Sequence, residues 1–344
     1  MRLVCLLSRV AAVALVAVVG GCAREKAPLV EAFSEEKPRL LRLQIDWLPQ
    51  IESGGYYQAQ ARGYYRALGL QVEIHGGGPG VPSKENVAAG VADIGAGDGN
   101  CVLVAASRGK PLVIVGAEMQ HSPVGLMFHR TRPLRSVRDL DGRTVVASGD
   151  LAWVDYLQST QRVRFDLRPA TADLAGFVVD ESLVRKCFVT QEPFVAERLG
   201  AKVGALLLAD SGYDPYRVIY SSRDFAEKNP EAIRRFLAAT IAGYNDLLGG
   251  DPTPAFRAIA AANPGMAEET MLHSLARMRE LRLVEGRAAE GERTGRIARE
   301  RIARDLERMQ ATGLVDGALS LSAVARFDLV PIEGAYPMEG LQTP

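Results

Sequence analysis

The chain has 344 residues, enough for two domains of ordinary size, and 47% of them are hydrophobic and 24% charged. This composition supplies apolar side chains for packed cores and excludes a chain that is disordered throughout. Because 41 basic side chains balance 41 acidic ones, the chain has no overall field that would hold a nucleic-acid backbone, and we expect no nucleic-acid partner.

The beginning of the chain differs in composition from the rest. Residues 10–19 are an unbroken apolar run of Val, Ala and Leu. This run is too short to span a bilayer core of about 30 Å and is typical of an export signal. Val19-Gly20-Gly21-Cys22 resembles the lipobox of bacterial lipoproteins, although that pattern usually has Leu where Val19 stands. We expect a signal peptide over 1–21, lipidation of Cys22 and a tether over 22–37; the alternative is a plain secretory signal with an incidental Cys22.

Two further cysteines, Cys101 and Cys187, lie in the remainder of the chain. Two cysteines do not make a disulfide framework, and the sequence contains no CxxC motif for zinc or redox chemistry. We therefore expect neither a metal site nor a disulfide-dependent fold.

The first part of the body alternates strands with helices. Leu41, Leu43 and Ile45 alternate with polar residues and predict a strand over 40–47. The pattern continues with helices over 55–68, 83–89 and 101–108, the second capped by Ser83, and with strands over 71–75, 92–96 and 112–116. Such an alternation predicts a parallel sheet covered by helices on both faces.

The alternation restarts near residue 125 and predicts a second, smaller α/β unit. Its strands are expected over 125–129, 144–147, 164–167, 186–190 and 204–208, and its helices over 152–161, 170–177 and 193–199. One more strand is expected over 217–221. The rest of the pattern is helical, beginning at Asn229 and Pro230, with helices over 230–248, 253–262, 267–280 and 296–312.

Several catalytic and cofactor motifs are absent. The sequence has no nucleophile elbow and no HExxH, and its four histidines lack the spacing of metal ligands. The glycine-rich segment 76–80 fails the phosphate-loop spacing, because Ser83-Lys84 reverses the required order, and is better explained as a flexible crossing loop. We expect no catalytic residues, no metal and no cofactor.

Aromatic and acidic residues gather after predicted strands. In open parallel sheets the carboxyl ends of the strands form the ligand crevice, so these positions are candidate ligand contacts. The candidates are Asp46, Trp47, Tyr56, Tyr57, Asp98, Asn100, Trp153, Glu192, Tyr213 and Tyr216. Each of these aromatic residues taken alone is as readily explained as a residue of the hydrophobic core. The argument for a ligand site rests on all the candidates together.

The sequence resembles the type II substrate-binding proteins of ABC importers, in the branch that binds thiamine pyrimidine precursors. The resemblance runs from about residue 41 to 330 and rests on short segments in a fixed order. These are Asp46-Trp47-Leu48-Pro49, Ala61-Arg62-Gly63-Tyr64-Tyr65 with Gly69-Leu70, Ala88-Ala89-Gly90-Val91-Ala92-Asp93, Asp139-Leu140-Asp141-Gly142-Arg143, Val189-Thr190-Gln191-Glu192-Pro193-Phe194, Asp210-Ser211-Gly212-Tyr213-Asp214-Pro215-Tyr216 and Asn229-Pro230-Glu231.

The resemblance implies a two-lobe periplasmic binding protein type II fold, each lobe a mainly parallel α/β sheet flanked by helices. Laid on this chain, lobe 1 would comprise 38–128 and 222–344 and lobe 2 would comprise 129–221, with 125–129 and 217–221 as a two-strand hinge. The family's aromatic clamp and carboxylate carry over to Trp47, Tyr56 or Tyr57, Trp153, Glu192 and Tyr216, with Asp46, Asp98 and Asn100 as weaker polar candidates.

The resemblance also implies a monomeric, lipid-anchored protein of the periplasm or cell surface that serves an ABC permease and ATPase. The expected cleft offers Asp46, Asp98, Glu192 and Asp214 with no lysine nearby, which disfavours a sulfonate or nitrate and favours a flat ring with an amino group. Two alternatives remain open: a pyrimidine-phosphate synthase-like enzyme on the same fold, whose cysteine-rich motif is missing here, and a sensory ligand-binding module.

Glu192 has two interpretations of its own. It can be a contact that accepts hydrogen bonds from an amino-bearing ring, or a carboxylate that stabilises the start of the helix expected at Pro193.

Overall fold

The computed structural model describes residues 33–148, 151–171, 173–332 and 334–336. The expected signal peptide, Cys22 and most of the expected tether lie outside these residues. In the part of the chain that is described, no helix is both long enough and apolar enough to cross a membrane.

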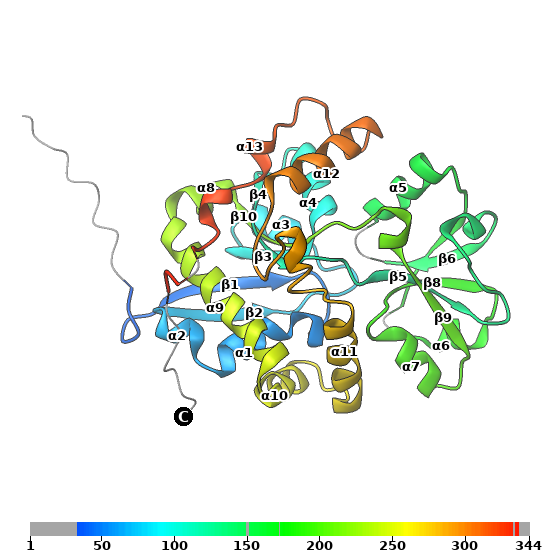
Figure 1. Ribbon diagram of the computed structural model, residues 1–344, viewed down its shortest axis with the longest axis horizontal. Coiled ribbons are helices and arrows are strands. Elements are labelled where there is room, and N and C mark those ends of the chain that lie inside the picture. The colour runs from blue at the N-terminus through cyan, green and yellow to red at the C-terminus, as the bar shows by residue number, and fades with distance from the viewer. Residues whose placement is uncertain (1–32, 149–150, 172, 333, 337–344) are drawn as a thin grey trace, which may run out of the picture. The chain divides into compact units, whose positions relative to one another are not determined.

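The described strands form two five-stranded sheets (Figure 1). The first sheet has the order β2-β1-β3-β10-β4 and comprises β1 (Arg39–Ile45), β2 (Leu70–His75), β3 (Ile94–Asp98), β4 (Leu112–Met119) and β10 (Arg217–Ser222). The second has the order β7-β6-β8-β5-β9 and comprises β5 (Val124–His129), β6 (Thr144–Ala147), β7 (Asp166–Pro169), β8 (Leu183–Phe188) and β9 (Val203–Leu207). We call the first sheet with its helices the first lobe, and the second sheet with its helices the second lobe.

Both sheets are mainly parallel, as expected, and each contains one described strand that runs against the other four. β1 pairs in parallel with β2 and β3, but β10 runs antiparallel between β3 and β4. In the second sheet β6 is parallel to β7 and β8, whereas β5 is antiparallel to both β8 and β9. The reason is topological: β5 and β10 each arrive from the other lobe, so each enters its sheet at the carboxyl edge of the parallel strands and must run in the opposite direction.

The sheets to which β5 and β10 belong place the lobe boundaries a few residues away from the expected ones. β5 belongs to the second sheet and β10 to the first, so the chain crosses between lobes over 120–123 and 212–216. The expected boundaries placed 124–128 in the first lobe and 217–221 in the second. A two-lobed α/β architecture with two crossings is nevertheless what the sequence predicts, and the structure confirms it.

Helices cover both faces of the first sheet. One face packs on α1 (Gly54–Ala61), α2 (Tyr64–Ala67), α9 (Pro230–Gly249), α10 (Thr253–Ala262) and α11 (Glu268–Glu280), and the other on α3 (Ser83–Ala88), α4 (Gly99–Ser107), α12 (Arg299–Ala311) and α13 (Leu321–Val324). The strand period explains the division, because Val113 and Val115 of β4 belong to the first core while Leu112 and Ile114 belong to the second. The short α8 (Arg223–Lys228) follows β10.

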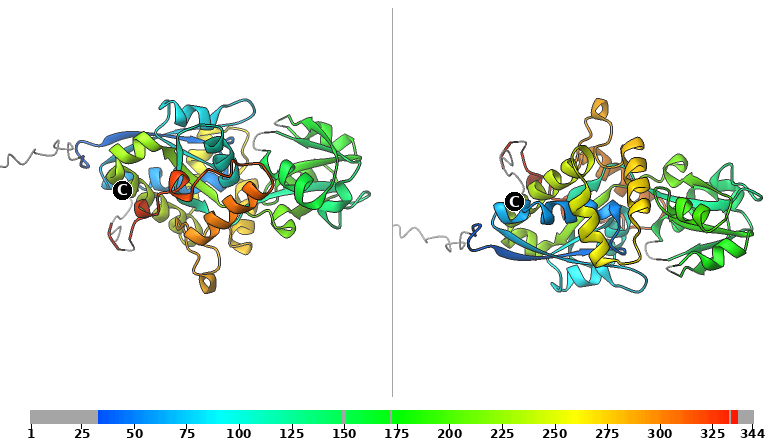
Figure 2. Two further views of the ribbon diagram at one scale, coloured as in Figure 1. Left: turned by 90° about the horizontal axis from the view of Figure 1, so that it is seen from above. Right: turned by 90° about the horizontal axis from the view of Figure 1, so that it is seen from below.

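The second lobe has the same layering at smaller size. α5 (Ala152–Gln161) covers one face of its sheet, and α6 (Ala175–Val179) and α7 (Glu192–Arg198) cover the other. Leu126 and Phe128 of β5 point to the α5 core, whereas Met127 points to the α6 and α7 core. The two views of Figure 2 show these green elements together, beside the blue and yellow-to-red elements of the first lobe.

Candidate functional site

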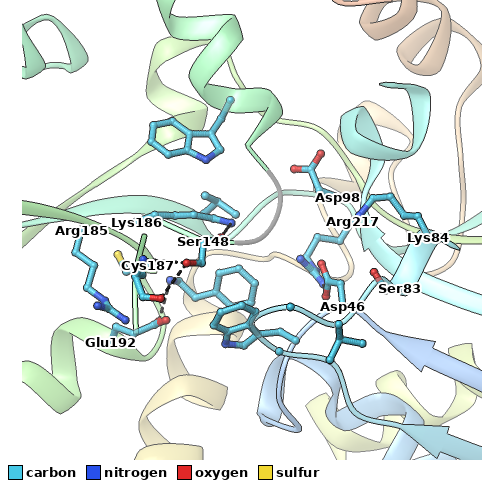
Figure 3. A pocket seen from close by; sticks show the side chains of 18 of the residues that line it. Asp46, Ser83, Lys84, Asp98, Ser148, Arg185, Lys186, Cys187, Glu192 and Arg217 are labelled. Carbon is cyan, nitrogen blue, oxygen red and sulfur yellow. Dashed lines mark hydrogen bonds and ion pairs between the residues drawn. The ribbon is translucent and has the colours of Figure 1, made fainter. Parts of the chain in front are cut away.

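A cavity of about 300 Å³ lies between the two lobes, at the carboxyl edges of the parallel strands (Figure 3). Both lobes line it. The first lobe contributes Asp46, Trp47, Gly78, Gly80, Val81, Ser83, Lys84, Glu85, Asp98 and Arg217, and the second contributes Val124, Ser148, Trp153, Ala170, Arg185, Lys186, Cys187, Phe188 and Glu192. The two tryptophans of the chain therefore stand in opposite walls.

In the wall formed by the first lobe, Arg217 is held by two carboxylates. Its Nη2 donates to Asp46 Oδ1 at 2.6 Å and its Nε to Glu118 Oε2 at 2.9 Å. Burial opposes the charge of this guanidinium, yet Asp46 and Glu118 together hold the pKa of Arg217 well above its usual range. Asp46 is thus part of a fixed ion cluster, and its charge is already opposed before any ligand enters.

Asp98 caps the helix that follows it. Its Oδ1 accepts a hydrogen bond from the backbone N–H of Cys101 at 3.1 Å, at the start of α4. The hydroxyl of Tyr213 lies 3.4 Å from both carboxylate oxygens. Since Tyr213 belongs to the second crossing, this contact ties that crossing to the end of β3.

In the opposite wall, Glu192 is the first residue of α7. Its Oε2 accepts the backbone N–H of Phe188 at 2.8 Å, which closes the turn between β8 and α7. Burial raises the pKa of Glu192, while the N–H of Phe188 and the nearby charge of Arg185 oppose that rise. Lys186 Nζ donates to the backbone oxygen of Ser148 at 3.4 Å.

The structure brings together half of the residues expected at the site. Asp46, Trp47, Asp98, Trp153 and Glu192 line the cavity. They share one feature, namely that each stands at or just after the carboxyl end of a parallel strand or in the helix that follows it.

The other five expected residues lie away from the lining of this cavity. Tyr56 and Tyr57 lie in the first turn of α1 and are buried in the core, where the Tyr56 ring lies 6.2 Å from that of Phe236. Asn100 is buried in the first turn of α4. Their positions are explained by the helical period, which turns these side chains toward the sheet.

Tyr213 and Tyr216 lie in the second crossing. The Tyr213 ring packs 5.2 Å from the ring of Tyr156. The Tyr216 hydroxyl accepts the backbone N–H of Ala298 at 3.2 Å, and the guanidinium of Arg301 lies 4.0 Å above its ring. Both tyrosines therefore brace the crossing against neighbouring elements.

The expectation of a cleft without lysine is wrong. Lys84 from α3 and Lys186 from β8 line the cavity on opposite sides, together with Arg185 (Figure 3). Asp214, which was expected in the cleft, instead accepts a hydrogen bond from His121 at 2.7 Å. The charge argument against a sulfonate or nitrate therefore no longer holds.

Sequence reasoning missed these basic residues for identifiable reasons. Lys84 follows the glycine-rich segment 76–80, which reads as a plain loop, and Arg185 and Lys186 lie inside a strand rather than after it. Two adjacent basic residues inside an otherwise apolar strand were the available signal at 183–188.

Residues 50–253, more than half of the chain, match the protein family described as NMT1/THI5 like. A curated relative, the riboflavin-binding protein RibY of Chloroflexus aurantiacus, is 28% identical over 243 residues, which cover 67% of this chain and 69% of RibY.

Solved structures match the fold. The periplasmic aliphatic sulphonate binding protein SsuA from Escherichia coli superposes with a TM-score of 0.59 at 18% identity, covering 86% of this chain and 94% of SsuA. The periplasmic nitrate-binding protein NrtA from Synechocystis PCC 6803 gives a TM-score of 0.59 at 12% identity, covering 85% of this chain and 87% of NrtA. The chain therefore has the two-lobed fold of the periplasmic binding proteins.

Proposed function

Because the chain belongs to the NMT1/THI5-like family, we propose that it is an extracytoplasmic solute-binding protein of an ABC-type importer. It captures a small molecule between its lobes and passes it to a permease driven by an ATPase. It acts as a monomer, anchored through a lipid on Cys22, and carries out no reaction of its own.

One observation supports this proposal above the others. The cavity lies between two lobes that are covalently joined only by the crossings at 120–123 and 212–216, and each lobe supplies one wall. A ligand that contacts both walls favours the arrangement in which they are close, so binding and lobe closure are coupled. A solute-binding protein needs this coupling to present two distinct states to its permease.

The lining favours a planar heteroaromatic ligand of the pyrimidine type. Trp47 supplies an aromatic ring to the lining from the first lobe, and Phe188 and Trp153 supply rings from the second. Positive and negative side chains are present in both walls, so the site has fixed donors and acceptors for the edge of such a ring. RibY, by its name, binds riboflavin, whose ring system includes a pyrimidine ring.

A thermal-shift screen of the full chain tests the function. The panel contains thiamine precursors, nucleobases, flavins, aliphatic sulfonates and nitrate. A solute at 100 times its Kd adds about 2.7 kcal/mol to the free energy of unfolding, which is a measurable rise in melting temperature. We expect one heteroaromatic class to give this rise.

Two variants show whether the rise comes from the cavity. Trp47→Ala removes a ring from the lining and should abolish the rise. Leu48→Ala changes the adjacent residue, which is 36% exposed and outside the lining, and should leave the rise intact. The proposal fails if no solute stabilises the chain or if both variants respond like the parent.

A further inference from the structure

Arg217 offers a hydrogen-bond donor that no described residue accepts. It belongs to β10, is 6% exposed and lines the cavity. Its Nε and Nη2 donate to Glu118 and Asp46, whereas Nη1 has no acceptor in the part of the chain that the structure describes. Nη1 also keeps access to solvent, unlike the sealed unpartnered atoms elsewhere among these residues. A ligand in the cavity can therefore accept a hydrogen bond from Nη1.

Asp46 offers an acceptor beside this donor. Its Oδ1 accepts from Arg217 Nη2 at 2.6 Å, whereas Oδ2 has no donor among the described residues and is likewise not sealed. Gly97 of β3 leaves room for the carboxylate, since a Cβ at Gly97 would lie 3.1 Å from Oδ2. Figure 3 shows the carboxylate of Asp46 next to the guanidinium of Arg217. The hydrogen bond between the two residues therefore holds one spare donor and one spare acceptor together in the same wall.

The pair is fixed in place by further contacts. Glu118 accepts from Arg217 Nε at 2.9 Å and, through its other oxygen, from the hydroxyl of Tyr244 at 3.1 Å. The guanidinium carbon of Arg217 lies 5.2 Å from the centre of the Phe188 ring, which belongs to the second lobe. A donor and an acceptor that are already held in position lose little conformational freedom when a ligand binds.

The formal charges of the cavity lining balance. Four acidic and four basic side chains line the cavity. Within the wall of the first lobe, Asp46 and Arg217 oppose each other directly. A solute with a full charge would leave part of this balanced set unopposed, so the lining suits a neutral polar solute. This argument rests on the balance of charges and requires no absence of basic residues.

We propose that Asp46 and Arg217 recognise a neutral polar edge that carries one hydrogen-bond acceptor and one donor. Arg217 Nη1 donates to the acceptor, and Asp46 Oδ2 accepts from the donor. In a pyrimidine-type ring this edge is either a ring carbonyl beside an N–H or a ring nitrogen beside an amino group. The inference rests on the proposed function and specifies its ligand class. A sulfonate or nitrate offers acceptors only, so one of its oxygens would face Asp46 without a proton between them.

Isothermal titration of the full chain with two matched pairs of probes tests this edge. Riboflavin has a ring carbonyl beside an N–H, and 3-methylriboflavin lacks that N–H. The second pair is 4-amino-5-hydroxymethyl-2-methylpyrimidine and its 4-dimethylamino analogue, which lacks the amino donor. Ethanesulfonate is the anion that offers acceptors only. We expect at least one donor-bearing probe to bind and its methylated partner to bind at least about tenfold more weakly, as the loss of a hydrogen bond to a charged group requires.

Asp46→Asn tests whether the edge lies on this pair. Because Arg217 can only donate, the amide oxygen of the variant stays on Arg217 Nη2, and its NH2 group takes the place of the acceptor Oδ2. The preference for the donor-bearing probe over its methylated partner should then fall to about threefold or less. The matched control is Asp166→Asn, which should keep the preference. Asp166 also pairs with an arginine, Arg168, at 2.9 Å, but lies outside the lining.

The outcomes separate this inference from the function on which it rests. If ethanesulfonate binds and neither donor-bearing probe does, the neutral edge is overturned while the solute-binding function stands. A methylated probe that binds as well as its parent also overturns the edge, and this comparison uses the unaltered protein, so it decides even where Asp46→Asn does not fold. An Asp46→Asn protein that keeps the full preference overturns the assignment to Asp46 and Arg217. If no solute of any class binds, both proposals fail.

Discussion

Glu52 is a single buried carboxyl group at the contact between the lobes. It lies in the short 3-10 turn Ile51–Ser53, is 2% exposed, and accepts a hydrogen bond from the hydroxyl of Thr190 in the second lobe. Burial raises the pKa of Glu52 from 4.5 to about 7, and the hydrogen bond from Thr190 opposes that rise. The protonated form is therefore favoured in the folded protein.

The raised pKa of Glu52 makes the folded protein less stable as the pH rises. A carboxyl group whose pKa is higher in the folded state costs no stability below pH 4.5, and the cost of ionising it grows as pH rises to about 7 and is constant above. The full cost is about 3 kcal/mol. Glu52→Gln keeps the shape and an acceptor for Thr190 but cannot ionise. We expect the variant to melt at a higher temperature than the parent at pH 8 and at a similar temperature at pH 5, measured by calorimetry. Equal melting temperatures at pH 8 would contradict the shift.

A substitution of Glu192 distinguishes a ligand contact from a carboxylate that stabilises the start of α7. Glu192→Gln keeps an oxygen for the N–H of Phe188 and removes the charge that strengthens a bond to a ligand N–H. We expect about a tenfold rise in Kd for the bound heteroaromatic solute with an unchanged melting temperature of the free protein. A lower melting temperature with unchanged affinity would assign Glu192 to the β8 and α7 turn alone. The recognition carboxylate would then be Asp46 or Asp98.

The sequence predicts individual site residues only where strand position decides them. Asp46, Trp47 and Trp153 were found because the carboxyl ends of parallel strands meet at one edge. Tyr56 and Tyr57 follow the same rule in sequence, but α1 turns them into the core, a rotation that depends on tertiary packing.

At the scale of elements, the two crossings are fastened by a charged cluster. His121 of the first crossing has Nδ1 2.7 Å from Asp214 Oδ2 of the second and Nε2 2.9 Å from Glu292 Oε2. Arg301 of α12 binds Glu292 at 2.9 Å and the backbone oxygen of Asp214 at 2.9 Å. Because both ring nitrogens face carboxylates, His121 must be doubly protonated to donate to both.

The cluster predicts a second pH dependence of stability. The pKa of Glu52 is raised by burial, whereas the pKa of His121 is raised by its carboxylate partners. The hydrogen bond to Asp214 raises the pKa of His121, helped by Glu292 and opposed by partial burial and Arg301. Its stabilisation is complete below the unfolded value of 6.5 and is lost as pH rises through the folded pKa. We expect His121→Gln to lower the melting temperature at pH 6 and to lower it less at pH 9.

The control for this prediction is His75→Gln, since the His75 side chain is 42% exposed and its contact with Glu73 is long, at 3.7 Å. It should leave the melting temperature unchanged at both pH values. A His121→Gln variant whose effect is the same at pH 6 and pH 9 would show that the ring packs at this position without carrying charge.

Most elements could be predicted, and the exceptions have local or topological causes. The helix expected over 55–68 is divided into α1 and α2, because Gly63 adopts a left-handed φ of 73° that ends the first helix. Ser83 was expected to cap α3, but it is the first helical residue and makes no cap. The direction of β5 and β10 could not be read from local pattern, since an apolar run fits either direction.

At the scale of the whole molecule, the lobes also touch beside the cavity. Thr190 accepts a hydrogen bond from Ser274 of α11 at 3.1 Å through its backbone oxygen, and the rings of Phe194 and His273 stack 4.2 Å apart. These contacts join the turn between β8 and α7 to the first lobe. The two crossings and this contact together determine how far the lobes can separate.

The proposed lipid anchor makes a prediction about location. If Cys22 is acylated after removal of 1–21, the protein should sediment with membranes, and Cys22→Ser should release it or block its processing. Fractionation followed by mass spectrometry of the N-terminus measures both. A Cys22→Ser protein that is processed and still sediments with membranes would exclude this anchor. Cys101→Ser is the matched control and should not change the fractionation, because Cys101 is a buried residue of α4.

The central claim is that a solute binds between the two lobes and contacts both. The chain contains two tryptophans, and Trp47 lines the cavity from the first lobe and Trp153 from the second. The most direct test is a fluorescence titration with the stabilising solute in two single-tryptophan proteins, Trp153→Phe and Trp47→Phe. In each protein the remaining tryptophan should respond, and each response should saturate with the Kd that calorimetry gives for the same variant. A solute that binds by calorimetry while one or both tryptophans stay unchanged would contradict the claim.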